Sequence, residues 1–373
     1  MKIEFDRNQL LTGLQKIGAV AEKKSTMPIL GNLHLEAKGE SLTISATDLE
    51  IGIQTTCPVK VVAEGKVCTP AHQLIEIVKQ LPEKNGRLQK TENDWITLSC
   101  GKAQFRLAGV AADEFPQVVN AGEFKFSNLK TNTIQTAIEK TGFAISTDEM
   151  RYNLNGVYLE VKKEKGGIAF RMVATDGHRL AMFTRDLADD ETLTLAKGVI
   201  LPRKGINELR RLLEGVEEKQ VEVSVTGTNA CFRLNRTILS MRLVVGEFPD
   251  YTAVIPKGNK KKLVVNRNAL NDSLRRVSLL SEGKSKCVKF GIRGAGIHLA
   301  ATTPELGEAE EDIAGEFDGG ELEIGFNARY VLDALAAVDG DKVLFELDHE
   351  QSPGIIRAPN DPSYFGVIMP MRI

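Results

Sequence analysis

Apolar residues recur along this chain at two alternating spacings. A spacing of three and four residues, as at Leu10, Leu14 and Ile17, is typical of one face of a helix. A spacing of two, as in Val221-Glu-Val-Ser-Val225, is typical of a strand with one buried face. Antiparallel strands packed against helices make the expected fold class α+β. The predicted helices span residues 7–24, 71–81, 130–147, 203–214, 266–281 and 327–338.

The same order of elements occurs three times. Leu42-Thr-Ile-Ser-Ala-Thr-Asp48 recurs as Phe170-Arg-Met-Val-Ala-Thr-Asp176 and, more faintly, as Ile297-His-Leu-Ala-Ala-Thr-Thr303. The last residues of these stretches are 128 and 127 positions apart, which indicates three tandem copies of one unit. Glu114-Phe-Pro116 and Glu247-Phe-Pro249 close the first two copies. The predicted domains are 1–120, 121–252 and 253–373.

Length and composition set limits on the class of protein. A chain of 373 residues with 42% hydrophobic and 26% charged positions is an average globular protein, too long for one core. The charged start Met1–Asp6 is no leader peptide, and no apolar stretch reaches the length of a membrane span. We therefore expect a cytoplasmic protein without membrane contact.

The cysteines are five in number, widely separated, and contain no Cys-x-x-Cys pair. An odd, scattered set argues against both a disulfide framework and a zinc site, so we expect reduced thiols, no metal and no cofactor. The five are Cys57, Cys68, Cys100, Cys231 and Cys287.

Positive charge is concentrated on the predicted helices. These six stretches carry a net +8, and because the whole chain carries −2, the remainder carries −10. A basic surface built from repeated helices is typical of sequence-independent contact with DNA phosphates. The alternative for any single helix is an ordinary solvated face.

Simple geometry favours a ring made of two chains. Because a helix is about 10 Å wide, six helices around a circle leave an opening of about 9 Å, too narrow for a duplex. Twelve leave an opening of about 28 Å, which admits a duplex of about 20 Å with a layer of water. Two three-unit chains would close such a ring through a head-to-tail contact.

Two segments are candidates for that head-to-tail contact. One is a stretch of the first copy with basic and apolar residues in alternation. The other is in the third copy, where two leucines end a predicted helix and an acidic strand follows. The alternative for both is ordinary surface and core. The candidate interface residues are Lys102, Phe105, Leu107, Leu279, Leu280, Glu305, Glu308, Glu310 and Glu311.

An enzyme would have to use Thr175-Asp-Gly-His-Arg179, where Asp, His and Arg cluster. The repeat argues against this, because Asp48 occupies the position of Asp176 in the first copy and indicates a shared turn. No catalytic residue is therefore expected, and His178 is either structural or part of a binding site. A DNA-binding nuclease or regulator that grips the duplex from one side is the alternative function.

Six sequence blocks in order resemble one family, the bacterial sliding clamps, which are the beta subunits of DNA polymerase III. The resemblance covers the whole chain. It implies three clamp domains with antiparallel sheets outside and helices lining a central channel, in a ring-shaped head-to-tail homodimer without catalytic activity or cofactor. The blocks are Met27–Asn32, Ala174–Leu180, Pro202–Gly205, Glu247–Tyr251, Glu323–Asn327 and Met369–Ile373.

The family's function implies the expected partners. A sliding clamp is a processivity factor: it encircles duplex DNA without regard to sequence and tethers the replicative polymerase, the clamp loader and other clamp-binding proteins. Matched by position, the DNA-facing residues are Lys24, His72, Lys79, Tyr152, Arg203 and Lys204. His72 and Asn153 depart from the family, standing where relatives carry Arg and Tyr.

The family also has a peptide-binding cleft between the second and third domains that includes the chain end. Met369-Pro-Met-Arg-Ile373 finishes the chain with large apolar side chains, which suits a docked terminus that accepts apolar anchors. Ala253 replaces a basic residue of some relatives. The matching cleft residues are Leu154, Thr175, Gly177, His178, Arg179, Leu180, Pro249, Val254, Val367, Met369, Pro370, Met371 and Arg372.

Overall fold

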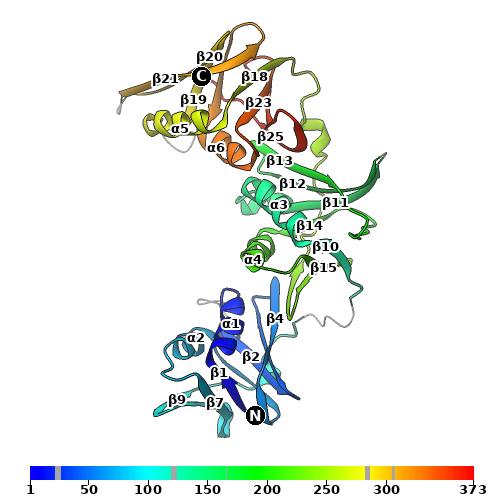
Figure 1. Cartoon of the computed structure of the whole chain (residues 1–373), viewed down its shortest axis with the longest axis vertical. Coiled ribbons are helices and arrows are strands. Elements are labelled where there is room, and N and C mark those ends of the chain that lie inside the picture. The colour runs from blue at the N-terminus through cyan, green and yellow to red at the C-terminus, as the bar shows by residue number, and fades with distance from the viewer. Residues whose placement is uncertain (22–26, 119–123, 165, 282–285, 305–306) are drawn as a thin grey trace. The chain divides into compact units, whose positions relative to one another are not determined.

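The computed structural model (Figure 1) describes residues 1–21, 27–118, 124–164, 166–281, 286–304 and 307–373. They form two compact units. Unit 1 comprises Met1–Asn132, Asp190–Thr194 and Lys204–Leu243, and unit 2 comprises Thr133–Asp189, Leu195–Arg203 and Val244–Ile373. Within the described residues, no helix is both long enough and apolar enough to cross a membrane.

All six predicted helices are present, and all six end earlier than predicted, three of them by four residues or more. The first ends at Ile17 and the third at Thr141, because Gly18 and Gly142 follow and glycine disfavours the helix interior. The fifth gives way to a 3-10 turn, Ser278–Leu280. The helices are α1 (Arg7–Ile17), α2 (Ala71–Lys79), α3 (Thr131–Thr141), α4 (Arg203–Leu213), α5 (Arg267–Val277) and α6 (Ala328–Ala337).

Unit 1 contains two antiparallel sheets. The five-stranded sheet has the order β5-β1-β7-β8-β9, and its strands are β1 (Lys2–Asp6), β5 (Lys60–Ala63), β7 (Asn85–Lys90), β8 (Ile96–Cys100) and β9 (Ala103–Leu107). The eight-stranded sheet has the order β10-β15-β16-β17-β4-β3-β2-β6. Its strands are β2 (Asn32–Lys38), β3 (Ser41–Thr47), β4 (Ile51–Pro58), β6 (Gly65–Pro70), β10 (Ser127–Lys130), β15 (Gln220–Val225), β16 (Asn229–Leu234) and β17 (Thr237–Arg242).

The core of unit 1 lies between helices and sheet. Asp6 caps α1 by accepting the amides of Asn8 and Gln9, and the helix packs against α2 and β4 (Figure 1). Leu10, Leu14 and Ile17 are buried there, as their spacing predicted.

Unit 2 contains one twelve-stranded antiparallel sheet in the order β14-β11-β12-β13-β25-β24-β23-β18-β21-β20-β19-β22. The second and third sequence copies meet in it, because β13 pairs with β25, Arg179 opposite Ile368. The strands are β11 (Gly156–Glu164), β12 (Gly167–Thr175), β13 (Arg179–Asp186), β14 (Val199–Pro202), β18 (Lys261–Asn266), β19 (Cys287–Arg293), β20 (Gly296–Thr303), β21 (Gly307–Asp318), β22 (Leu322–Asn327), β23 (Lys342–Leu347), β24 (Gly354–Ala358) and β25 (Asp361–Ile368).

The cysteines are free thiols, and all but the half-buried Cys287 are buried. Burial raises the pKa of Cys68 and Cys231 to about 12, so these thiols stay protonated and unreactive. All five lie in strands, as the sequence indicated. Across the part of the chain that the structure describes, no three His, Cys, Asp or Glu side chains are grouped so as to hold a metal ion.

Candidate functional site

The turn after β12 is built like the turn after β3. Asp176 Oδ1 accepts the amides of His178 and Arg179 at 3.0 and 3.1 Å, while Thr175 Oγ1 donates to the Arg179 carbonyl. Asp48 Oδ1 accepts the amides of Glu50 and Ile51 in the same way, at 3.0 and 2.8 Å. The prediction that Asp48 and Asp176 share a turn role is therefore confirmed.

The two turns differ in what they display. The left-handed position holds Leu49 in the first turn, with φ +75°, and Gly177 in the second, with φ +88°. Glycine adopts that conformation without strain and leaves the second turn without a side chain there. Arg151 reaches the second turn, where its Nη1 donates to the Asp176 carbonyl at 3.4 Å.

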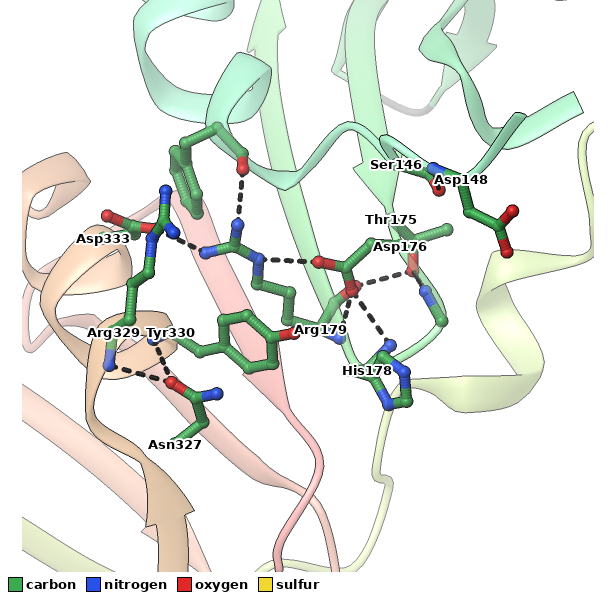
Figure 2. A network of polar contacts seen from close by, with 12 residues as sticks. Ser146, Asp148, Thr175, Asp176, His178, Arg179, Asn327, Arg329, Tyr330 and Asp333 are labelled. Carbon is green, nitrogen blue, oxygen red and sulfur yellow. Dashed lines mark hydrogen bonds and ion pairs between the residues drawn. The ribbon is translucent and has the colours of Figure 1, made fainter. Parts of the chain in front are cut away.

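Arg179 is held from four sides (Figure 2). Its Nε donates to Asp176 Oδ2 at 3.0 Å, its Nη1 to Asp333 Oδ2 at 2.6 Å, and its Nη2 to the Phe143 carbonyl at 2.6 Å. The guanidinium carbon also lies 4.4 Å from the ring centroid of Tyr330. With its side chain only 9% exposed, Arg179 fixes β13 against α6.

The imidazole of His178 stacks on the ring of Tyr330, at 6.5 Å between centroids and 19° between planes. Asn327 positions this helix end, because its side chain accepts the amides of Arg329 and Tyr330 and caps α6 (Figure 2). Sequence reasoning named neither Tyr330 nor Asp333 as a site residue. Of the residues at this helix end, only Asn327 was indicated by the sequence, because it is the last residue of the block Glu323–Asn327.

A second tie joins α3 to the end of α6. Lys140 is buried and donates to the Ala337 carbonyl at 2.8 Å and to Asp339 Oδ2 at 2.7 Å. Its ammonium also lies 5.3 Å from the ring centroid of Tyr364. The helix that carries Tyr330 is therefore held at both ends.

Beyond β25, the end of the chain runs from the turn that precedes β13 to the edge of β22. We call residues 369–373 the C-terminal strap. The Met369 amide donates to the His178 carbonyl at 2.9 Å, and the Met371 amide donates to the Gly325 carbonyl on β22 at 2.8 Å. A hollow of about 550 Å³ is lined by the strap together with Glu350 and Gln351.

An apolar cluster includes residues of β13 and β25, the strand that leads into the strap. Leu180 and Val367 are buried in it with Val173, Tyr251 and Ile355. Phe248 and Ile255 pack against the same cluster, so the segment containing Pro249 and Val254 borders it, and Val254 is half exposed. Leu154 is buried at the end of the 3-10 segment Glu149–Leu154, which contains Arg151.

Tyr251 joins this cluster to a buried carboxylate. Its hydroxyl donates to Glu160 Oε1 at 2.5 Å, and Arg171 Nη1 donates to the same oxygen at 2.9 Å. Burial raises the pKa of Tyr251 to about 12, so the hydroxyl keeps its proton. Burial opposes the charge on Glu160, but hydrogen bonds from Lys162, Tyr251 and Arg171 outweigh it and hold the pKa of that carboxyl below its usual value.

The candidate DNA-facing residues lie in different surroundings. His72 and Lys79 are exposed on α2, Arg203 is exposed at the start of α4, and Tyr152 is 60% exposed. Lys204 is paired instead, with its Nζ 2.8 Å from Asp48 Oδ2. Lys24 lies outside the described residues.

The candidate dimer residues of the first copy lie at a sheet edge. Phe105 and Leu107 are half-buried on β9, the outermost strand of the five-stranded sheet, and Lys102 is exposed just before it. In the third copy, Leu279 is 76% exposed and Leu280 half-buried.

The acidic residues of the third copy do not all face one way. Glu308 and Glu310 are exposed on β21, whereas Glu311 points to the other face and pairs with Arg276 of α5. Glu305 lies outside the described residues.

Three family profiles match the chain in succession. The N-terminal, central and C-terminal domains of the DNA polymerase III beta subunit match residues 1–119, 128–250 and 252–372. The three tandem clamp domains predicted from the internal repeat are therefore confirmed, while the boundaries near residues 120 and 252 stay predictions.

Individual relatives match over the full length. A beta sliding clamp of Caulobacter vibrioides (strain NA1000 / CB15N) is 36% identical over 375 residues, and one of Pseudomonas putida is 34% identical over 375 residues, with 100% of each chain covered. A crystal structure of the Caulobacter crescentus clamp superposes with a TM-score of 0.95 at 36% identity, covering 100% of both chains. The Bacillus subtilis clamp gives a TM-score of 0.94 at 29% identity, covering 100% of this chain and 99% of that one. The chain therefore belongs to the DNA polymerase III beta subunit family, the bacterial DNA sliding clamps.

Proposed function

We propose that this protein works as a cytoplasmic processivity factor without catalytic activity of its own. Two copies would close head to tail around duplex DNA. The surface that includes the turn at Gly177, Tyr330 and the C-terminal strap, which we call the candidate cleft, would accept short segments of the replicative polymerase, the clamp loader and other clamp-binding proteins.

The observation that carries the peptide-binding proposal is the construction of the cleft. Arg179 is fixed by two carboxylates, a carbonyl and a ring, so its wall is rigid before any partner arrives. Met369, whose amide donates to the His178 carbonyl, is 44% exposed, and its flexible thioether can adapt to different apolar anchors. A rigid wall combined with one flexible side chain is suited to binding several different partners, one after another.

The candidate catalytic groups are already occupied by structural contacts. Both oxygens of Asp176 accept hydrogen bonds within the turn, and the ring of His178 stacks on Tyr330. A second histidine, His349, has Nε2 2.8 Å from Ser352 Oγ, but its Nδ1 accepts the Gln351 amide. The neutral ring then carries its proton on Nε2 and cannot take the serine proton, which a nucleophile would require.

Retention on circular DNA tests the proposed ring. Protein loaded by a clamp loader onto nicked circular plasmid should stay bound through washing at 1 M salt, where phosphate contacts are screened, and should leave once the circle is cut. Topological linkage is the reason, because a closed ring needs no tight contact to remain. Equal retention on circular and linear DNA would contradict the ring.

The one-sided alternative, a nuclease or regulator, predicts a different result. Such a protein would bind linear and circular duplexes with equal affinity, and both complexes would dissociate together as salt increases. A product of strand cleavage, seen on a denaturing gel, would favour the nuclease.

A further inference from the structure

We propose that Gly325 is a positioning residue of the candidate peptide cleft, because it anchors the far end of the C-terminal strap. The inference rests on the proposed function of the cleft and names a residue that does not itself touch the partner. Gly325 acts through the course that it imposes on the strap between Met369 and Ile373.

Two backbone anchors hold the strap. The first is the His178 carbonyl, which accepts the Met369 amide at 2.9 Å, and the second is the Gly325 carbonyl, which accepts the Met371 amide at 2.8 Å. Only Pro370 lies between the two anchored residues, and its ring fixes φ. The stretch that presents the Met369 and Met371 side chains is therefore short, stiff and tied at both ends.

The second anchor has no room for a side chain. A Cβ on Gly325 would lie 2.9 Å from the Met371 carbonyl oxygen, 3.0 Å from Ile373 Cγ1 and 3.3 Å from Cys287 Sγ. The contact with Met371 is to backbone, so relief requires the strap itself to move. β22 is the last strand in its sheet, and Met371 forms an isolated bridge on its outer edge. The hydrogen bond from the Met371 amide to the Gly325 carbonyl ties the strap to this strand, and moving the strap would break it.

Gly325 also lies close to the other wall of the cleft. Two residues later, Asn327 caps α6 and positions Tyr330. The strap and the Tyr330 wall are thus set by one strand, and an experiment must separate the two effects.

The first experiment compares two buried strand glycines. Gly325→Ala should weaken binding of a fluorescein-labelled peptide copied from the clamp-binding segment of a bacterial replicative polymerase by about tenfold, since a wall displaced by about 1 Å loses its fit. Gly291→Ala is the matched control on the neighbouring strand β19, because its Cβ would meet nothing closer than 3.6 Å. Equal affinity of both variants and the unmodified chain would overturn the proposal.

A second pair of variants reaches the same hydrogen bond from the strap. Met371→Pro removes the amide that donates to Gly325, whereas Met371→Ala keeps the amide and removes only the side chain. Met371→Pro should therefore bind the peptide more weakly than Met371→Ala. No difference between them would show that the bridge does not position the strap.

Combining the variants separates the strap from α6. If Gly325 acts through the strap, adding Gly325→Ala to Met371→Pro should change the affinity by less than about twofold, because the shared contact is already lost. A full additional tenfold loss would mean that Gly325 acts through α6, and the proposal would be wrong.

Hydrogen exchange distinguishes this proposal from the proposed function. The Met371 amide should be protected in the unmodified chain and in Gly291→Ala, and should exchange faster in Gly325→Ala. Failure of the unmodified chain to bind any polymerase peptide would contradict the function of the cleft, while this exchange pattern would still support the anchor. A Met371 amide that exchanges equally fast in all three proteins would refute the anchor.

Discussion

The guanidinium carbon of Arg179 lies over the ring of Tyr330, 4.4 Å from its centroid, so that a side chain of β13 and one of α6 make a single wall. The two residues belong to different copies of the sequence repeat. Their contact makes the wall of the cleft depend on how the second and third copies pack.

Arg179→Lys should damage this wall although it keeps the charge. An ammonium has no planar fork and cannot reach Asp176, Asp333 and the Phe143 carbonyl together, so at least one part-buried acceptor loses its donor. We expect a loss of about 2 kcal/mol in the free energy of unfolding and weaker peptide binding. Urea unfolding and fluorescence anisotropy measure the two effects, with Arg293→Lys, at the exposed end of β19, as the control. Unchanged peptide affinity in Arg179→Lys would contradict a role in the cleft.

Tyr251→Phe should destabilise the protein in a pH-dependent way. The Tyr251 hydroxyl donates to the ionised form of Glu160, whose pKa in the folded protein lies below the usual 4.5. A carboxyl with a lowered pKa contributes stability that is complete above its unfolded pKa and is lost as pH falls through its folded pKa. The variant should therefore lose about 1–3 kcal/mol at pH 7, and less once Glu160 is protonated in both proteins.

Thermal unfolding midpoints at pH 7, 5 and 3.5 measure this difference. Tyr152→Phe is the control, because Tyr152 is 60% exposed and should show no effect at any of these pH values. A difference between Tyr251→Phe and the unmodified chain that stays constant as pH falls would show that the ring, not its bond to Glu160, sets the stability.

The apolar periodicity and the internal repeat predicted the helices and the shared turn well, because these local structures depend on the spacing of nearby residues. The turn at Asp176 could be inferred from its copy at Asp48, and both turns have the same hydrogen bonds. The two faces of β21 could also be predicted from sequence, because successive residues of a strand face opposite sides and Glu311 therefore faces away from Glu308 and Glu310. The sequence analysis nevertheless assigned all three to one interface. Local sequence patterns were therefore sufficient to predict the shared turn, and they would also have been sufficient to predict the two faces of β21.

The parts that sequence could not predict depend on distant contacts. Asp333 is 154 positions from Arg179, and no periodic pattern relates the two. The same holds for the bridge between Met371 and Gly325, which depends on where β22 and β25 lie in the sheet. Such pairings follow from how the copies pack, and one sequence alone does not specify them.

The pairing of Lys204 with Asp48 predicts unequal roles for the basic residues. Removing a lysine that contacts a phosphate reduces the slope of log affinity against log salt by about one. We expect that reduction for Lys79→Ala. For Lys204→Ala we expect less than half of it, because Asp48 already neutralises the lysine charge at 2.8 Å.

Asp48→Asn keeps an oxygen that can accept the amides of its turn, and it should strengthen binding to linear duplex DNA between 50 and 200 mM salt. Equal slopes for Lys79→Ala and Lys204→Ala would show that the ion pair opens on DNA.

The last prediction concerns the head-to-tail contact. Leu279 is 76% exposed in the 3-10 turn that follows α5, so Leu279→Asp should leave the fold intact. Leu280 is a poorer choice, because it is half-buried and its carbonyl accepts the Thr303 hydroxyl.

If Leu279 is covered by a second copy, burying a carboxylate there costs several kcal/mol, and the dimer dissociation constant should rise by about 100-fold or more. Sedimentation velocity measures the change, with Val245→Asp, 84% exposed elsewhere, as the control. A Leu279→Asp protein that keeps its thermal midpoint and sediments as a dimer would place Leu279 outside the interface.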